Sequence, residues 1–351
     1  MRSSIAIGAI ATMGLTILFS GCSGSEGGAP AESSSASTFT KLQGAGASFP
    51  APLYTKWFRD YSKSQGNVQI DYQSVGSGSG VKSFLDKTVD FGASDAAMKP
   101  EEIAQVSEGV VLLPMTAGSV VLAYNLEGVA SLNLTRETYT GIFLGKVTRW
   151  NDPAIQASNE GVALPDLPIN VVVRADSSGT TYVFTKHLSE ISTEFAASPG
   201  TNKMPNWPVG TRSKGNEGVT ASIMTTPGSI GYVEYGYAKG QSLPTASLQN
   251  KSGAFVAPST ASAQAALSQA EMPDDLILWI SDPDGEASYP IVTYTWLLCY
   301  MTYEDAAKAA VLKDVVNYCL DKGQAESESL GYIPLPENVV TKVKAALDTI
   351  S

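Results

Sequence analysis

Short apolar runs alternate along the chain with longer segments in which apolar residues recur every three or four positions. Several runs predict strands, because they are short, rich in Val, Ile, Phe and Tyr, and bounded by glycine or polar residues: residues 68–76, 89–95, 109–126, 169–174, 228–238 and 289–300. The run at 109–126 is interpreted as two buried strands around a turn at Pro114–Met115. Strands that alternate with helices are typical of an α/β protein.

The spacing of apolar residues predicts helices after several of these strands. Phe184, Leu188, Ile191 and Phe195 are four, three and four residues apart, which places them on one buried face of a helix. Residues 303–323 also predict a helix, and they end at a glycine, which is a common helix stop.

The N-terminus predicts an export signal, which we assign to residues 1–21. Arg2 precedes an uncharged apolar stretch that is shorter than the roughly 20 residues of a membrane span. Small residues directly before Cys22 resemble the end of a lipoprotein signal, although Phe19 stands where leucine is usual. Cys22 is therefore the predicted lipidation site, and ordinary cleavage with an unmodified cysteine is the alternative. Residues 22–39 are rich in Ser, Gly and Ala and predict a flexible tether.

Length and charge narrow the choice of function. A chain of 351 residues is too long for one ordinary core even without its leader, which predicts two domains. Its net charge of −11 argues against nucleic-acid binding, which requires basic patches. A small anion is not excluded, because it meets local donors rather than the net charge. Cys299 and Cys319 could pair in an exported protein or remain buried free thiols.

Four polar turns stand between a predicted strand and a predicted helix, at residues 44–52, 76–80, 92–95 and 174–180. Each is rich in Gly, Ser, Ala or Thr, and helix N-termini offer unpaired N–H groups and a positive dipole end. One such turn predicts only a helix cap, a role open to Asp176 or Ser177. Four turns, gathered at the carboxyl ends of the strands, predict a site for a small oxyanion held mainly by neutral donors.

Two nucleotide-binding motifs are absent from the sequence. A dinucleotide fingerprint that starts at Gly76 would need glycine where Val81 stands. A phosphate-binding P-loop needs Ser or Thr after Gly-Lys, but Val147 follows the pair Gly145–Lys146. The glycine-rich turns therefore do not predict a nucleotide site.

Five motifs in this order resemble the phosphate-binding proteins of bacterial high-affinity phosphate ABC transporters: GAGASFPAPLYTKW, VGSGSGVKSF, VDFGASDA, VVRADSSGTTYVFT and PGSIGYVEYGYA. The resemblance runs from about Gly44 to Ala346. It implies an α/β periplasmic-binding-protein-like fold of type II, with two lobes, two crossover strands and a ligand cleft. Lobe 1 would comprise residues 40–124 and 287–351, and lobe 2 residues 125–286.

The resemblance also implies the function and the site. The protein would capture inorganic phosphate outside the cytoplasm, without a cofactor or metal. It would deliver phosphate to ABC permease subunits with a cytoplasmic ATPase, either in the periplasm or on the outer face of the membrane. The phosphate-binding residues carried over from the motifs are Ser48, Phe49, Ser77, Asp95, Arg174, Ser178, Gly179 and Thr180, with Ala47 and Asp176 in support.

The charged residues of this site have distinct expected roles. Phosphate keeps a proton near neutral pH, which the Asp95 carboxylate could accept in a charge-assisted hydrogen bond. Sulfate has no proton, so it would face Asp95 with like charge, whereas arsenate would be excluded less well. Arg174 could hold Asp176 and the anion together, because its guanidinium is planar. A helix cap at Asp95 and a purely structural Arg174–Asp176 ion pair are the alternatives.

Other functions remain as alternatives. An exported phosphatase or esterase could use Ser177 or Ser178 as nucleophile, but it would need a general base. The single histidine, His187, falls in mid-helix, where a packed or surface role is more typical. No cluster with metal-ligand spacing is found in the sequence. Binding of sulfate, molybdate or arsenate is a further alternative.

Overall fold

The computed structural model describes residues 39–351. The predicted signal peptide, the predicted lipidation site Cys22 and the predicted tether up to residue 38 lie outside the described residues. Within 39–351, no helix is both long and apolar enough to cross a membrane.

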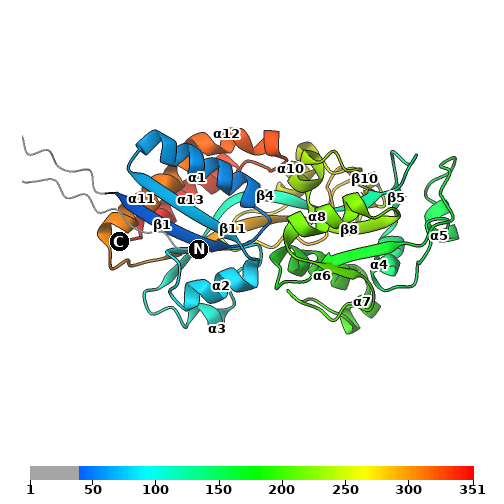
Figure 1. Ribbon diagram of the computed structural model, residues 1–351, viewed down its shortest axis with the longest axis horizontal. Helices are drawn as coiled ribbons and strands as arrows, with labels where there is room; N and C mark the ends of the chain where they lie inside the picture. Colours follow the sequence, from blue (N-terminus) through cyan, green and yellow to red (C-terminus); the bar gives the residue numbers. More distant parts are fainter. Residues whose placement is uncertain (1–38) are drawn as a thin grey trace, which may run out of the picture. The chain divides into compact units, whose positions relative to one another are not determined.

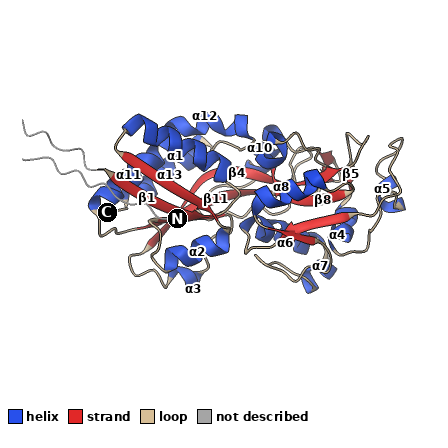
Figure 2. Ribbon diagram, in the orientation of Figure 1, coloured by secondary structure: helices blue, strands red, loops and turns tan. Residues whose placement is uncertain are grey.

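An eight-stranded sheet organises the described chain (Figures 1 and 2). Its strands, in spatial order, are β2 (Val68–Ser74), β1 (Thr40–Gly46), β3 (Phe91–Ser94), β11 (Val292–Tyr300), β4 (Val110–Asn125), β8 (Ser229–Glu234), β6 (Asn170–Arg174) and β7 (Thr211–Ser213). A smaller sheet has the order β10 (Phe255–Val256), β9 (Ser247–Gln249) and β5 (Asn133–Leu134). The α/β class predicted from the apolar runs is confirmed.

The sheet contains two parallel groups on either side of a central antiparallel pair. β1 runs parallel to β2 and β3, and β6 runs parallel to β7 and β8. Between these groups, β4 pairs antiparallel with β11 along its first part and with β8 along its second part. β4 is therefore shared by both groups, and with β11 it corresponds to the expected crossover strands.

The interpretation of residues 109–126 as two strands around a turn is wrong. They form the single strand β4, which continues through Pro114 and Met115. The register against β11 shifts here, so that Thr116 faces Thr295 and Pro114 faces Trp296. Met115 is the extra residue of a bulge, and a bulge is one of the few places where a sheet accommodates proline, which has no N–H to donate.

Helices follow most of the parallel strands and cover the sheet (Figure 2). They are α1 (Ala51–Gln65), α2 (Ser77–Leu85), α3 (Pro100–Ile103), α4 (Arg136–Phe143), α5 (Pro153–Gln156), α6 (Gly179–Ile191), α7 (Thr193–Ala197), α8 (Gly215–Thr225), α9 (Tyr235–Gly240), α10 (Thr260–Leu267), α11 (Ala306–Tyr318), α12 (Gln324–Ser327) and α13 (Glu337–Asp348). A π-helical turn, Cys319–Gly323, joins α11 to α12, and a 3₁₀ turn, Glu328–Leu330, follows α12.

Three boundaries differ from the sequence prediction. The helix expected to carry both Phe184 and Phe195 is divided at Ser192, whose extended backbone ends α6 and whose side chain caps α7. The helix expected to stop at Gly323 continues into α12. The run at 228–238 is a strand only to Glu234 and then becomes α9. In each case a side-chain cap or a tertiary contact decides where the element ends. The periodicity of apolar residues carries no information about either kind of contact.

The beginning and the end of the described chain pack together. α11 contacts β1 and α1, and α13 contacts β4, as Figure 1 shows where blue and orange ribbons adjoin. Trp57 of α1 donates to the Gly323 carbonyl at 2.8 Å in the buried interior. These contacts suit a discontinuous lobe 1, but one continuous sheet runs through both expected lobes, and their boundaries remain a prediction. Cys299 and Cys319 are both buried free thiols.

Candidate oxyanion site

The site residues stand at the carboxyl ends of parallel strands from both groups. β1, β2 and β3 lead to Ser48, Ser77 and Asp95, while β6 and β7 lead to Arg174 and Asn216. The two groups run in opposite directions, with β3 level with the first part of β4 and β8 paired with its second part, so their carboxyl ends face each other near the middle of β4. The structure therefore brings together residues that are as far apart in sequence as Ser48 and Asn216, which are hydrogen-bonded to each other.

The turn after β1 offers two backbone donors. The amides of Ser48 and Phe49 have no hydrogen-bond acceptor within residues 39–351. The Ser48 hydroxyl accepts hydrogen bonds from the Asn216 amide N–H at 3.0 Å and from Asn216 Nδ2 at 2.9 Å. Ala47 donates its own amide to the Ala93 carbonyl, so it anchors the turn rather than facing the site.

Asp95 lies at the centre of a buried hydrogen-bond network. Thr295 on β11 donates its hydroxyl to Asp95 Oδ1 at 2.8 Å. Ser77 Oγ lies 3.4 Å from Oδ2 and accepts the Asp95 amide N–H at 3.2 Å. Burial raises the pKa of Asp95 from 3.8 to about 6, although Thr295 and the Arg174 guanidinium both oppose that shift. A carboxyl group in this position changes protonation state close to physiological pH.

Arg174 is held by a bidentate ion pair. Its Nε and Nη2 donate to the two carboxylate oxygens of Asp176 at 2.8 and 2.6 Å. Its Nη1 lies 3.4 Å from the Thr180 hydroxyl, at the start of α6. The guanidinium is almost fully buried, and Asp176 also accepts from the Gly215 amide at 3.0 Å. This fixed geometry leaves the Nη1 side of the guanidinium turned toward the site residues.

The first turn of α6 supplies further donors. The amides of Gly179 and Thr180 have no acceptor among the described residues, as expected at a helix N-terminus. Ser178, rather than Asp176 or Ser177, caps this helix, because its hydroxyl accepts the Thr181 amide at 3.0 Å. The Ser178 amide already donates to the Lys203 carbonyl at 2.9 Å. Ser178 was expected to offer an anion both its amide and its hydroxyl. With the amide already bonded, the hydroxyl proton is the donor that remains.

The first turns of α2 and α6 touch each other directly. The Gly78 amide donates to the Ser177 carbonyl at 2.9 Å. A Cβ atom at Gly179 would lie 2.6 Å from Asp95 Oδ2 and would also overlap Ser77 Oγ. Glycine is required at 179 because Ser77 and Asp95 approach its backbone this closely. Residues expected in different lobes therefore close around the site.

Two residues of the site were missed by sequence reasoning. Asn216 Nδ2 bridges the hydroxyls of Ser48 and Thr180, at 2.9 and 3.2 Å, and is fully buried. The segment that contains it, SKGNEG at the end of β7, is also polar, contains two glycines and precedes a helix, so this residue could have been found. Thr295 lies in mid-strand in an apolar run, where nothing in the sequence distinguishes it from a packing residue.

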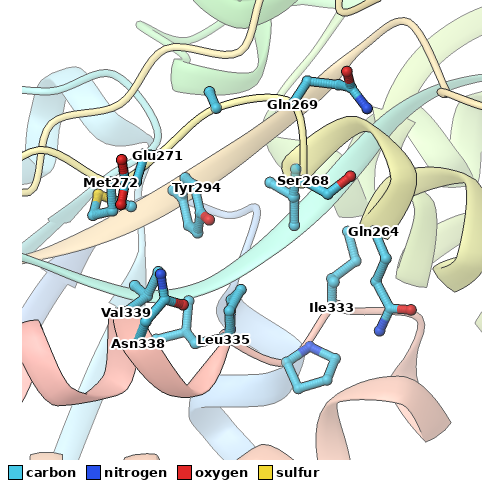
Figure 3. A pocket seen from close by; sticks show the side chains of 14 residues that line it. Gln264, Ser268, Gln269, Glu271, Met272, Tyr294, Ile333, Leu335, Asn338 and Val339 are labelled. Carbon is cyan, nitrogen blue, oxygen red and sulfur yellow. The ribbon is translucent and has the colours of Figure 1, made fainter. Parts of the chain in front are cut away.

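A separate pocket of about 680 Å³ lies between the end of α10 and the C-terminal segment (Figure 3). Met272, Tyr294 and Val339 contribute to its walls, and Glu271 is the one charged residue among those that line it. Without a cationic lining residue, this pocket is unsuited to an oxyanion. It contains none of the residues predicted for the site.

The histidine that an enzyme would need is not placed as a base. His187 is buried in α6, and its Nε2 is 2.8 Å from the Tyr139 hydroxyl. Burial lowers the pKa of His187 to about 4, so the ring is neutral at physiological pH. It has no hydrogen bond to Ser177 or Ser178. Within residues 39–351, no group of three His, Cys, Asp or Glu side chains is arranged to hold a metal ion.

Comparison with known proteins first places the chain in the PBP superfamily. The family model of the PBP superfamily domain matches residues 31–322. Solved structures share the fold, among them a high-affinity periplasmic phosphate-binding protein bound with phosphate (TM-score 0.72, 22% identity) and a phosphate-binding protein from Stenotrophomonas maltophilia (TM-score 0.70, 22% identity). Each match covers 87% of this chain and 93% of the other.

Curated relatives then define the family. Phosphate-binding protein PstS of Pasteurella multocida is 41% identical over 312 residues, which are 88% of this chain and 90% of the relative. Phosphate-binding protein PstS of Methanocaldococcus jannaschii is 36% identical, with 92% and 89% covered. Phosphate-binding protein PstS 2 of Mycobacterium tuberculosis is 33% identical, with 100% and 99% covered. The chain belongs to the PstS family of phosphate-binding proteins.

Proposed function

We propose that this protein captures inorganic phosphate outside the cytoplasm and delivers it to an ABC permease for import. The observation that carries the proposal is the set of unpaired donors around Asp95 and Arg174. Backbone amides of Ser48, Phe49 and Gly179 lack partners among residues 39–351. Hydrogen bonds through Thr180 Oγ1 and Asn216 Nδ2 link the Ser48 hydroxyl to the buried Arg174 guanidinium. Family membership supports the same ligand, because the curated relatives are named phosphate-binding proteins.

The composition of the site supports an oxyanion that carries a proton. Neutral donors and one guanidinium suit unprotonated oxygens, whereas a carboxylate at Asp95 suits an O–H group. Sulfate would place an unprotonated oxygen against that carboxylate, which costs several kcal/mol when both are buried, by an order-of-magnitude estimate. Phosphate is therefore favoured over sulfate and molybdate, and arsenate is the least excluded competitor.

A binding role is favoured over hydrolysis. A serine nucleophile in the 177–180 turn would need a base within hydrogen-bond reach. Ser178 instead accepts the Thr181 amide as a helix cap, and the single histidine is bonded to Tyr139. The relatives are likewise named as binding proteins.

Calorimetry tests the proposal directly. The purified protein is first freed of bound anion by unfolding, dialysis and refolding, and it is then titrated with phosphate, sulfate and arsenate. We expect one phosphate per chain, much weaker binding of sulfate than of phosphate at neutral pH, and no turnover of a chromogenic phosphate ester. Ester hydrolysis that co-purifies with the protein and disappears in Ser178→Ala would overturn the binding role.

Export and anchoring form a second part of the proposal. Residues 1–21 would direct export, and lipid on Cys22 would tether the folded part to the outer face of the membrane. The native protein should then partition into detergent, and Cys22→Ser should move it to the aqueous phase. Equal partitioning of the two forms would leave a secreted protein without an anchor.

A further inference from the structure

Three tyrosine hydroxyls surround the turn that follows β1, and the motif GYVEYGYA supplies one of them. Tyr72 on β2 donates to the Ala47 carbonyl at 2.7 Å. Tyr237 on α9 donates to the Ser48 carbonyl at 2.6 Å. Tyr332, in the C-terminal segment, donates to the Phe49 carbonyl at 2.7 Å. Three consecutive carbonyls are thus each bonded to a side chain from a different element.

The planarity of the peptide group gives two of these bonds a special meaning. The Ala47 carbonyl belongs to the same peptide group as the Ser48 N–H, and the Ser48 carbonyl to the same group as the Phe49 N–H. In a trans peptide the C=O and N–H bonds point in opposite directions. A hydroxyl that holds the carbonyl on one side therefore aims the N–H toward the other side.

A hydrogen bond to a carbonyl also strengthens the N–H donor of the same peptide. Hydrogen bonds in a chain polarise one another, and the effect is larger where water is excluded. The amides of Ser48 and Phe49 lack acceptors within residues 39–351, so the gain in donor strength is available to a bound anion. Outward carbonyls also keep their negative ends away from it.

We propose that Tyr72 and Tyr237 are positioning residues for phosphate binding, which orient and polarise the two peptide groups whose N–H bonds meet the anion. This inference rests on the proposed function. It assigns a role to the GYVEYGYA segment, which contributes none of the predicted site residues. It also links the site to α9. This helix follows β8, which β11 and β4 separate from β1 in the sheet, and Tyr237 reaches from it to the turn after β1.

Burial keeps these hydroxyls in the donor form. Desolvation raises the pKa of both Tyr72 and Tyr237 well above the usual value, and neighbouring acidic groups act in the same direction. Both hydroxyls therefore remain protonated donors at and around neutral pH.

Tyr332 is a control provided by the chain itself. Its hydroxyl makes the same kind of bond to the same turn, but the Phe49 carbonyl belongs to a peptide whose nitrogen is that of Pro50. Proline has no N–H to polarise. Loss of the Tyr332 hydroxyl should therefore destabilise the turn without weakening an anion donor.

The test is a set of three Tyr→Phe variants, which remove a hydroxyl and retain the ring. Phosphate affinity and the dissociation rate are measured on anion-free wild type, Tyr72→Phe, Tyr237→Phe and Tyr332→Phe, and thermal unfolding is recorded for each. We expect Tyr72→Phe and Tyr237→Phe each to weaken phosphate binding about three- to tenfold, mainly through faster dissociation. Tyr332→Phe should lower the unfolding temperature with phosphate affinity within about twofold of wild type.

The outcomes separate this inference from the proposed function. A wild-type protein that binds no phosphate overturns both. Wild-type binding with unchanged affinity in Tyr72→Phe and Tyr237→Phe overturns the positioning role alone. An equal loss of affinity in all three variants would show general loosening of the turn. A loss confined to Tyr237→Phe would show that this hydroxyl acts in closing the protein around the anion. Both results contradict polarisation of the two peptides.

Discussion

At the scale of single residues, the proposed selectivity depends on one buried carboxyl group. Asp95 is surrounded by donors that would suit any tetrahedral anion, and we propose that its carboxyl group distinguishes a protonated oxygen from a bare one. Thr295 donates to Oδ1, whereas Oδ2 lies against Gly179 at the start of α6. Thr295 therefore holds Oδ1 at 2.8 Å, whereas Oδ2 has the longer contact with Ser77 Oγ at 3.4 Å, and we expect Oδ2 to be the oxygen that faces a ligand.

This difference between the two oxygens makes Asp95→Asn informative. Thr295 should hold the amide oxygen in the position of Oδ1, which turns the NH₂ group toward the anion. We expect phosphate affinity to fall about five- to tenfold through loss of a charge-assisted acceptor, and sulfate affinity to rise as the like charge is removed. Competition calorimetry gives the phosphate-to-sulfate ratio. If that ratio is the same as in wild type, Asp95 is only structural.

The raised pKa of Asp95 predicts a pH dependence of the same selectivity. Below about pH 6 the carboxyl holds a proton and becomes a donor, so sulfate should bind more tightly as pH falls through 6, by at most about tenfold per pH unit for one linked proton. Titration of sulfate between pH 5 and 8 measures this, and the slope should vanish in Asp95→Asn. Sulfate binding that weakens toward acid pH would contradict it.

Folding stability should respond with the corresponding sign. The folded carboxyl has a pKa of about 6 against an ordinary 3.8, so the folded state keeps this proton to a higher pH. The contribution of Asp95 to stability is therefore full below about pH 4 and is lost as pH rises through 6. His187 acts in the opposite direction, because its folded pKa of about 4 makes protonation favour unfolding.

The sequence allowed most of the site residues to be named but not their partners. Ser48, Asp95 and Arg174 stand in polar turns, where composition alone suggests a ligand. Thr295 and Tyr332 act through hydroxyl groups that reach residues about 200 or more positions away. A hydroxyl in an apolar strand has the same local pattern whether or not such a partner exists, so sequence reasoning had no signal for it.

At the scale of elements, the close approach of α2 and α6 depends on glycine. A Cβ at Gly179 would overlap Ser77 and Asp95, so Gly179→Ala should force the two turns apart. Overpacking of this kind costs about 1–3 kcal/mol, and we expect phosphate affinity to fall about tenfold or more. Calorimetry measures the loss.

Gly240→Ala is the matched control for this change. Gly240 ends α9, and a Cβ there would meet nothing within 4 Å. Phosphate affinity in Gly240→Ala should equal that of wild type. Wild-type affinity in Gly179→Ala would show that the α2 and α6 turns need not touch for binding.

Element boundaries were predicted well where glycine and apolar periodicity agree and poorly where tertiary contacts decide. The strands β2, β3 and β6 lie within their predicted runs. Pro114 suggested a break in the run at 109–126, but a bulge at Met115 lets β4 continue through the proline while it stays paired with β11. Whether a proline ends a strand depends on the register of the partner strand, and that information is not local.

At the scale of the whole molecule, residues of the two expected lobes are in direct contact at the site. Gly78 and Ser177 are hydrogen-bonded across the site, and β4 connects both parallel groups of the sheet. We expect the anion-free protein to open about the strands β4 and β11. Small-angle scattering should show a smaller radius of gyration with phosphate than without it. An identical radius in both conditions would indicate a static site.

The contact between the α2 and α6 turns has a consequence for kinetics. An anion enclosed by these turns cannot be displaced by a competitor, because no second anion can reach the site before the turns separate. The release of labelled phosphate during a chase should therefore proceed at one rate, however much unlabelled phosphate is added. That rate cannot exceed the frequency of opening, so the fold itself sets a minimum average time for which each phosphate is held.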